Sequence, residues 1–244
     1  MTDFYAVYDA LLSGIHGHDV ITAAAAGSFW TCVETADRFG MAMTTEGSSI
    51  PPMLSDHLIG TELQQLAKAV VSWNFREAGF GMAAVNGFYN TPERLAQLRA
   101  AAAFDRYCTD GLELSGKRIG VVGHLNMPDF IREQAAEVLI LERNPRPGDY
   151  PDSACDVILP TCDIVLITGS ALTNKTLPHL LECCPQACTI LTGPSVPLCP
   201  ALLELGLDRL AGLVVTEPAA MADRVLRNLA GPPYDMGQSF LLCR

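Results

Sequence analysis

The residues best placed to do chemistry lie in the segment KRIGVVGHLNMPD, residues 117–129. An apolar, β-branched run ends at Gly123, His124 follows it directly, and Pro128 and Asp129 are typical of the start of a helix. A strand that ends in glycine and turns into a helix forms the usual ligand-binding corner of an open α/β sheet. We therefore expect His124 to face a ligand, where an imidazole can ligate a metal, accept a proton or bind an anion.

Other predicted strands end in similarly polar loops. Their candidate residues are Glu142, Thr168, Gly169, Asn174, Thr176, Gly193, Pro194 and Ser195. Such loops offer backbone and hydroxyl hydrogen bonds to a polar or anionic ligand, although the same residue types also form turns and helix caps. Because several of them follow strands of one sheet, beside Gly123 and His124, we predict a ligand-binding site at that edge.

A long helix predicted over residues 73–90 carries two further candidates. Glu77 is an acid/base candidate and Asn86 is a ligand-binding candidate. They are nine residues apart, roughly half a turn out of phase on a regular helix. If the helix is continuous, the two side chains do not face the same pocket, whereas Asn86 and Asn90 share a face.

Metal chemistry is the first reading of the histidine and its acidic neighbour. Neutral imidazole and carboxylate suit a borderline divalent transition metal, so His124 and Glu142 are the expected ligands and, with Glu77, the expected catalytic groups. The nine cysteines include no C-x-x-C pair, which leaves a structural zinc site with little support. Free cysteines are commonly small buried hydrophobes, and we expect His179 at the surface or with its partners satisfied.

Composition excludes several classes of partner. The net charge of −11 argues against nucleic acid and against anionic membrane surfaces. The longest apolar run, residues 20–26, is too short to span a bilayer. No signal peptide is evident and the cysteines lack the spacing of a disulfide scaffold, so we expect a cytoplasmic protein with reduced thiols. A homodimer is compatible with the sequence, since small cytoplasmic proteins often self-associate.

The order of predicted elements divides the 244 residues into two domains. Residues 1–110 predict a helix, a hairpin of strands over 31–34 and 39–43, and helices over 60–70 and 73–90, which is an α+β pattern. Residues 111–244 alternate strands and helices, which predicts a parallel sheet with helices on both faces. The expected strands cover residues 118–122, 138–142, 164–168, 188–192 and 212–216. There is no G-x-G-x-x-G after the first of them and no Walker A motif, so a standard nicotinamide or ATP enzyme is not expected.

Four motifs carry a resemblance to the heavy-metal chelation family of bacterial and archaeal proteins. They are W-N-x-x-E-A-x-x-G-x-A-A-x-N from Trp73, V-V-G-H from Val121, I-L-P-x-x-D-I-V-L-I-T-G-S-A-L-x-N-x-T-L from Ile158, and G-P-S-V-P-L-x-P from Gly193. The resemblance implies an amino-terminal domain like the one that precedes the enolase barrel, a Rossmann-like carboxyl-terminal domain, and a site in the cleft between them. Leu125 and Asn126 depart from the Phe-Pro that usually follows the histidine.

Two main hypotheses follow. In the first, the protein handles a metal ion or metal complex in the interdomain cleft, with or without catalysis. In the second, it is a metal-free enzyme or binding protein for a small polar metabolite or nucleotide-like ligand, which the strand-end loops suit equally well. A non-catalytic assembly protein is the third reading, for which an exposed apolar patch would be the signature.

Overall fold

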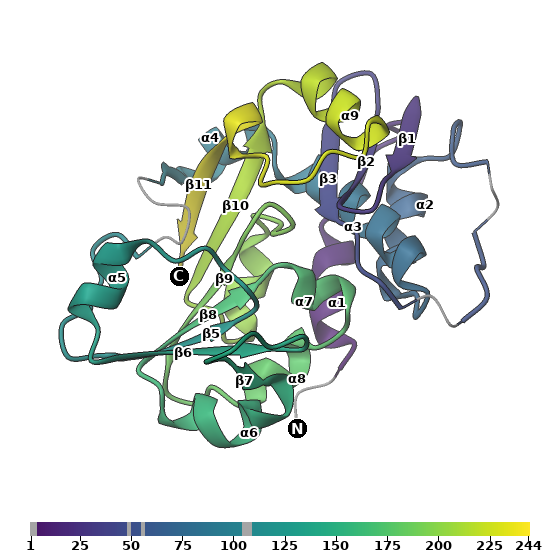
Figure 1. The fold of residues 1–244 in the computed structure, drawn as a ribbon. Helices are drawn as coiled ribbons and strands as arrows, with labels where there is room; N and C mark the ends of the chain where they lie inside the picture. The colour runs from purple at the N-terminus through teal and green to yellow at the C-terminus, as the bar shows by residue number, and fades with distance from the viewer. Residues whose placement is uncertain (1–3, 48–49, 55–56, 104–108) are drawn as a thin grey trace.

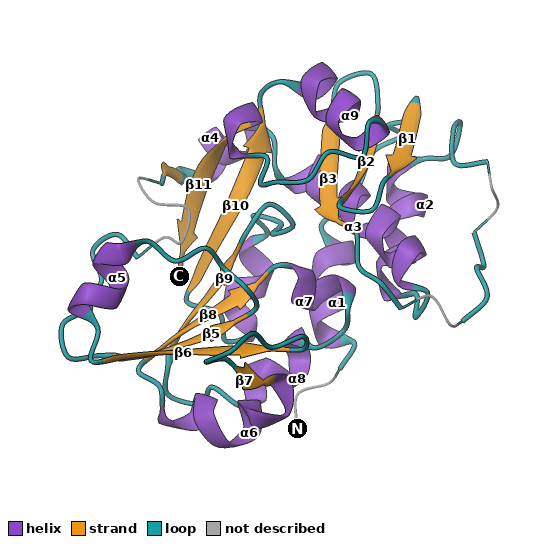
Figure 2. Ribbon diagram, viewed as in Figure 1, coloured by secondary structure: helices purple, strands orange, loops and turns teal. Residues whose placement is uncertain are grey.

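Two sheets organise the chain. The computed structural model describes residues 4–47, 50–54, 57–103 and 109–244. A three-stranded antiparallel sheet comes from the first fifty residues, and an eight-stranded, mostly parallel sheet comes largely from the second half. Figure 2 shows the larger sheet as a twisted fan beside the smaller one. Within the described residues, no helix combines the length and apolar character needed to cross a membrane.

The amino-terminal half confirms the predicted hairpin and the long helix. Its elements are α1 (Ala6–Ser13), β1 (Ala23–Ala26), β2 (Trp30–Glu34), β3 (Phe39–Met43), α2 (Leu63–Ala67), the 3-10 helix η1 (Lys68–Val71), α3 (Phe75–Tyr89) and α4 (Pro92–Leu98). The helix predicted over residues 60–70 starts later and finishes as a 3-10 turn. The long helix is continuous, and it begins where the Asn74 side chain accepts hydrogen bonds from the backbone N–H groups of Arg76 and Glu77.

Small residues let α3 lie directly on its neighbours. A Cβ added at Gly40 of β3 would overlap backbone atoms of Ala83 and Gly87, so the helix and the strand touch through their backbones. A Cβ at Gly81 would similarly overlap the backbone of Val70 in η1. These contacts fix α3 across one face of the small sheet.

The carboxyl-terminal half follows the predicted alternation and adds an unpredicted edge. Its elements, with the short strand that precedes them, are β4 (Ala101–Ala102), β5 (Arg118–Val122), α5 (Asp129–Gln134), β6 (Glu137–Glu142), β7 (Tyr150–Pro151), η2 (Asp152–Ala154), α6 (Cys155–Ile158), η3 (Leu159–Thr161), β8 (Ile164–Thr168), α7 (Ser170–Thr173), α8 (Leu177–Glu182), β9 (Cys188–Thr192), η4 (Pro200–Leu205), β10 (Arg209–Val215), α9 (Pro218–Leu226), η5 (Tyr234–Met236) and β11 (Gly237–Cys243).

The large sheet has the strand order β4-β11-β10-β9-β8-β5-β6-β7. Strands β10, β9, β8, β5, β6 and β7 are parallel, while β11 pairs antiparallel with β10 along its whole length and with β4 on its other side. Predicted strands β5, β8 and β9 have the observed bounds. The sequence pattern did not predict β11, and it therefore missed the antiparallel edge.

Helices cover both faces of the large sheet, as the alternation predicted. Because neighbouring strand residues point to opposite faces, Val165 and Ile167 face α6, α7 and α8, whereas Leu166 faces α5 with its buried Ile131. In Figure 1, α5 lies on one side of the fan of strands, and α6 and α8 lie on the other. The central strands β5, β8 and β9 are thus buried on both faces, whereas the edge strands β4 and β7 are exposed.

The two halves of the chain share one continuous core. Helix α1 lies beside α7 in Figure 1, and the Tyr8 hydroxyl donates to the Leu172 carbonyl oxygen at 3.0 Å. Helix α9 packs on the small sheet through Met221 and Val225, which meet the buried Trp30. Strand β4 joins the large sheet although it comes before residue 110. The boundary predicted near residue 110 therefore stays a prediction.

Candidate functional site

The glycine after β5 creates the corner that presents His124. Gly123 has a φ of +103°, and a Cβ there would approach the Thr168 side chain to 2.9 Å. Its N–H donates to the Leu141 carbonyl oxygen at 2.9 Å, which keeps it in register with β6. Glycine alone tolerates this backbone conformation at such close range. The sharp turn places His124 at the carboxyl edge of the sheet, as the sequence predicted.

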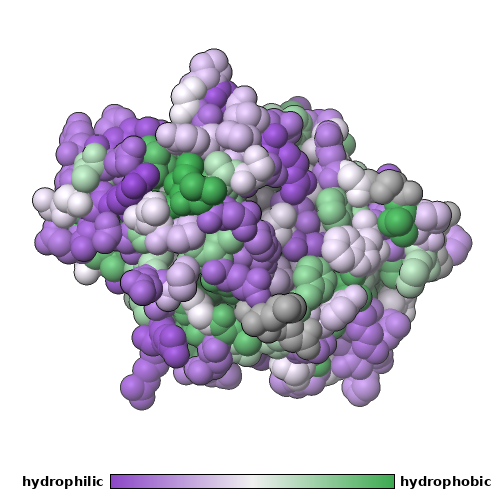
Figure 3. Space-filling model, turned by 90° about the horizontal axis from the view of Figure 1, so that it is seen from below, coloured by the Kyte–Doolittle hydropathy of each residue, from purple (hydrophilic) through white to green (hydrophobic). Residues whose placement is uncertain are grey.

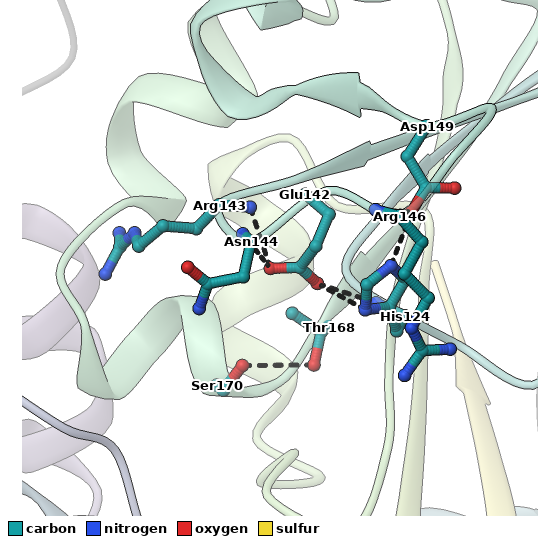
Figure 4. A network of polar contacts seen from close by, with 8 residues as sticks. All are labelled: His124, Glu142, Arg143, Asn144, Arg146, Asp149, Thr168 and Ser170. Carbon is teal, nitrogen blue, oxygen red and sulfur yellow. Dashed lines mark hydrogen bonds and ion pairs between the residues drawn. The ribbon is translucent and has the colours of Figure 1, made fainter.

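The His124 ring lies between two carboxylates (Figure 4). Its Nε2 is 2.6 Å from Oδ2 of Asp149, and its Nδ1 is 3.5 Å from Oε2 of Glu142. Side-chain exposure is 23% for His124, 20% for Glu142 and 9% for Asp149, so the group is sheltered but open to solvent on one side. We call these three residues the His124 group.

Asp149 orients the His124 ring. Its Oδ2 lies at hydrogen-bond distance from Nε2 of His124 and also accepts the backbone N–H of Arg146 at 2.8 Å. The histidine contact, followed by the Arg146 contact, lowers the pKa of Asp149, so this carboxyl stays ionised. An ionised acceptor favours the tautomer with the hydrogen on Nε2, in which Nδ1 is the nitrogen available to a metal ion.

Glu142 is anchored by backbone N–H groups at the end of β6. Oε2 accepts the N–H of His124 at 2.9 Å, and Oε1 accepts the N–H of Arg143 at 2.7 Å. The carboxylate therefore has a fixed orientation. Oε2 keeps a second lone pair that is directed to the same region as Nδ1 of His124.

The spacing of these two atoms fits one metal ion. Two ligands of a tetrahedral ion, each about 2.1 Å from it, lie about 3.4 Å apart. The observed separation between Nδ1 of His124 and Oε2 of Glu142 is 3.5 Å. Asp149 then has the orienting role that a carboxylate commonly plays behind a metal-binding histidine. The two donors fill only part of a coordination sphere.

The predicted residues of β8 and β9 continue the same edge. Thr168 lies below Glu142 in Figure 4, and its Oγ1 is 3.2 Å from Oγ of Ser170. A Cβ added at Gly169 would lie 2.7 Å from the Val196 side chain and 3.0 Å from its backbone nitrogen, so the segment after β8 touches the loop after β9. Gly193, at the start of that loop, has a φ of +125°. The carboxyl ends of β5, β8 and β9 are thus packed side by side.

The loop after β9 also reaches the small sheet. Oγ of the buried Ser195 accepts the N–H of Met43 at 2.7 Å, and Pro194 beside it is half-buried. Asn90 reinforces this junction by bonding backbone groups of Val196, Leu198 and Leu213. The sheet edge that carries the His124 group is therefore joined, through β9, to the amino-terminal half.

Asn174 and Thr176 bond to each other. The Asn174 side-chain oxygen accepts the Thr176 N–H at 3.2 Å and its hydroxyl at 2.7 Å, in the turn that leads into α8. The buried Lys175 lies between them with a φ of +69°, and its Nζ donates to the Val70 carbonyl oxygen at 2.5 Å. This turn is also attached to the amino-terminal half.

Glu77 and Asn86 are not brought to the His124 group by any hydrogen bond that the structure shows. The buried Glu77 accepts the N–H groups of Met53 and Leu54 and the hydroxyl of Ser72. Asn86 donates to the Met41 carbonyl oxygen at 2.7 Å. Their partners lie on different sides of α3, as the nine-residue spacing predicted.

Two pockets on the described surface are lined by other residues. One of about 490 Å³ is lined by Ala25, Ala26, Gly27, Ser28, Arg76, Val225, Leu226 and Asn228. The other, of about 500 Å³, lies at the amino ends of the parallel strands and includes Lys117, Asp163 and Cys188. The His124 group lies at the opposite ends of those strands and lines neither of these pockets.

Asp149 is the residue of this site that the sequence did not single out. It belongs to the segment RNPRPGD, where it resembles ordinary turn chemistry. A turn closed by the Asp149 N–H and the Arg146 carbonyl oxygen folds it back to the histidine. The only sequence signal for this contact is that Asp149 follows β6, the strand that pairs with the one before His124.

Comparisons with known proteins place the whole chain in one family. Two family models, both described as "Putative heavy-metal chelation", match residues 110–238 (DUF364) and 8–89 (DUF4213). A crystal structure of a DUF364 protein of unknown function from Desulfitobacterium hafniense DCB-2 is 33% identical, with a TM-score of 0.88 over 99% of this chain and 98% of that one.

A second DUF364 structure, from Pyrococcus horikoshii and also of unknown function, shares the fold. It is 22% identical, with a TM-score of 0.77 over 99% of both chains. No curated protein matches the chain. The fold of the whole chain, with both of its sheets, is thus the fold of these solved structures. The chain belongs to the DUF364 family, whose model is described as "Putative heavy-metal chelation".

Proposed function

We propose that the protein binds a divalent metal ion, or the complex of such an ion with a small organic ligand, through Nδ1 of His124 and Oε2 of Glu142. The observation that carries the proposal is the 3.5 Å separation of these atoms, with Asp149 bonded behind the ring at 2.6 Å. The family description supports the metal itself. Imidazole nitrogen and carboxylate oxygen favour a borderline ion such as Zn²⁺.

A metal complex suits the site better than a bare ion. Two protein donors leave at least two coordination positions for water or for atoms of an organic ligand. The hydroxyls of Thr168 and Ser170 lie at the same edge, where they can bond polar groups of that ligand. The predicted turns at Gly169, Gly193 and Ser195 extend this edge towards the amino-terminal half.

The short contact between His124 and Asp149 favours one alternative. A histidine oriented by an ionised carboxylate is also the arrangement of a general base. In a metal-free enzyme for a small polar metabolite, Nδ1 of His124 would accept a proton from the substrate. Such a protein would keep its ligand when metals are removed by chelation, whereas the proposed metal-complex protein would release it.

The test is elemental analysis of untagged protein purified without oxygen and then dialysed against Zn²⁺. We expect His124→Ala and Glu142→Gln each to lose one equivalent of metal relative to the unsubstituted chain. Glu137→Gln is the matched control, because it makes the same change at the other end of β6, where Glu137 pairs with Arg118. Equal metal content in all four proteins would refute the proposed site.

Cytoplasmic location and a homodimer stay predictions. Light scattering coupled to size-exclusion chromatography measures the mass directly, and twice the chain mass of 26.2 kDa is the expected value for a dimer. We also retain the prediction that neither nucleic acid nor membrane is a partner, because the net charge is −11.

A further inference from the structure

A second set of metal-type ligands lies on the helices below the sheet. Asp156 is on α6, His179 is on α8, and Cys183 caps the end of α8 four residues later. One ligand atom from each residue lies within 4.8 Å of the other two. Among the described residues, no other group of three His, Cys, Asp or Glu side chains converges in this way. It shares no residue with the His124 group.

The three distances match one face of a coordination tetrahedron. Nε2 of His179 is 3.1 Å from Oδ1 of Asp156, and Sγ of Cys183 is 3.6 Å from that nitrogen and 3.7 Å from that oxygen. For Zn²⁺, with bonds of about 2.05 Å to nitrogen or oxygen and about 2.3 Å to sulfur, the expected separations are about 3.4 Å for N to O and about 3.6 Å to sulfur. No large movement is needed to accept the ion.

The surroundings leave a fourth position open. The side chain of Asp156 is 62% exposed and that of His179 is 57% exposed, while Cys183 is buried beneath them. Figure 3 views the molecule from the side on which α6 lies in Figure 1, and hydrophilic residues there surround separate hydrophobic patches. A cation at the three atoms would rest on the buried sulfur and meet solvent on its outer side.

The helix geometry explains why the three atoms converge. Residues four apart lie on one face of a helix, so His179 and Cys183 project together from the end of α8. The Cys183 N–H donates to the His179 carbonyl oxygen at 3.2 Å, which continues the helical pattern to the cysteine. The ion pair between His179 and Asp156 is exposed and contributes little stability by itself. Such an ion pair also has no need of the Cys183 thiol that lies beside it.

We propose that Asp156, His179 and Cys183 bind a borderline divalent cation such as Zn²⁺, with the fourth position held by water or a small exogenous ligand. The site is additional to the one at His124 and has a sulfur donor that the first site lacks. Binding converts the thiol to a metal-bound thiolate, and the displaced proton goes to solvent.

Proton release is a measurable consequence. A free thiol carries a proton that a metal-bound thiolate lacks, so each bound ion displaces one proton from Cys183. The His124 site needs no such release from a thiol.

Titration of the reduced, full-length protein with Co²⁺ under oxygen-free conditions tests the proposal. Thiolate bonded to Co²⁺ gives a charge-transfer absorption in the near ultraviolet, which nitrogen and oxygen ligands do not give. We expect the band in the unsubstituted chain and in His124→Ala, and its loss in Cys183→Ser. Cys184→Ser is the matched control, because this neighbouring cysteine is equally buried and lies outside the triad.

His179→Asn provides a second variant at an exposed position, where misfolding is not expected. Loss of one of three protein ligands should weaken Co²⁺ binding by at least about tenfold while circular dichroism stays unchanged. Absence of the band in the unsubstituted chain, or its persistence in Cys183→Ser, would overturn the proposal. Retained affinity in His179→Asn would do the same. If His124→Ala keeps both the absorption band and its full metal content, the result counts against the His124 site alone.

Discussion

Asn90 offers a quantitative test of how the two halves of the chain are held together. Its side-chain amide donates to the carbonyl oxygens of Val196 at 2.8 Å and Leu213 at 3.1 Å, and its oxygen accepts the Leu198 N–H at 2.8 Å. Asn90 is only 6% exposed. Asn90→Ala therefore leaves three buried backbone groups without a partner, at about 1–3 kcal/mol each. Allowing for partial relaxation, we expect a loss of about 3–6 kcal/mol in the free energy of unfolding.

Asn86→Ala is the matched comparison on the same face of α3. Asn86 donates one hydrogen bond, to the Met41 carbonyl oxygen, and its own buried oxygen has no partner among the described residues. Removing it costs one bond and also removes an unsatisfied atom, so the expected loss is about 1 kcal/mol. Urea unfolding followed by circular dichroism measures both variants. Equal losses, or a larger one for Asn86→Ala, would refute this account of the junction.

Three further predictions concern the site and the core. Asp149→Asn should weaken Zn²⁺ binding about 10- to 100-fold in calorimetric titration, because the orienting carboxylate is lost; unchanged affinity would remove Asp149 from the site. Gly123→Ala should lower stability by about 1–3 kcal/mol in urea unfolding, given the φ of +103° and the Thr168 side chain 2.9 Å away; an unchanged midpoint would contradict the strained turn. Burial raises the pKa of Cys32 to about 11 and of Cys184 to about 12, so their contribution to stability is complete below pH 9 and is lost as pH rises through those values. Burial lowers the pKa of Lys175 to about 8, so this residue alone would raise stability with pH, but the buried thiols outnumber it. We therefore expect the melting temperature of the reduced protein to fall from pH 9 to 11. A melting temperature that rises over this range would refute the prediction.

The parallel core of the fold was predictable from the sequence because its strands are buried on both faces. The runs at β5, β8 and β9 are mostly apolar and are followed directly by Gly123, Gly169 and Gly193, which marks both their type and their bounds. Strand β11 lacks these signals. It begins with polar residues, and its pairing with β10 depends on a partner more than twenty residues earlier.

The candidate site was predictable only in part, for the same physical reason. His124 follows β5 and Glu142 ends β6, and the parallel pairing of these two strands places the residues together. Asp149 reaches the ring through a turn that local sequence does not specify. Likewise, the four-residue spacing of His179 and Cys183 was visible, but Asp156 comes from a different helix.

A crystal structure of the protein with Zn²⁺, with anomalous scattering recorded at the zinc edge, tests the His124 metal site directly. We expect an anomalous peak about 2.1 Å from both Nδ1 of His124 and Oε2 of Glu142. Asp149 should still be bonded to Nε2 of the same ring. A fully occupied peak elsewhere with none at this position, or a peak bonded to Nε2 in place of Asp149, would contradict it.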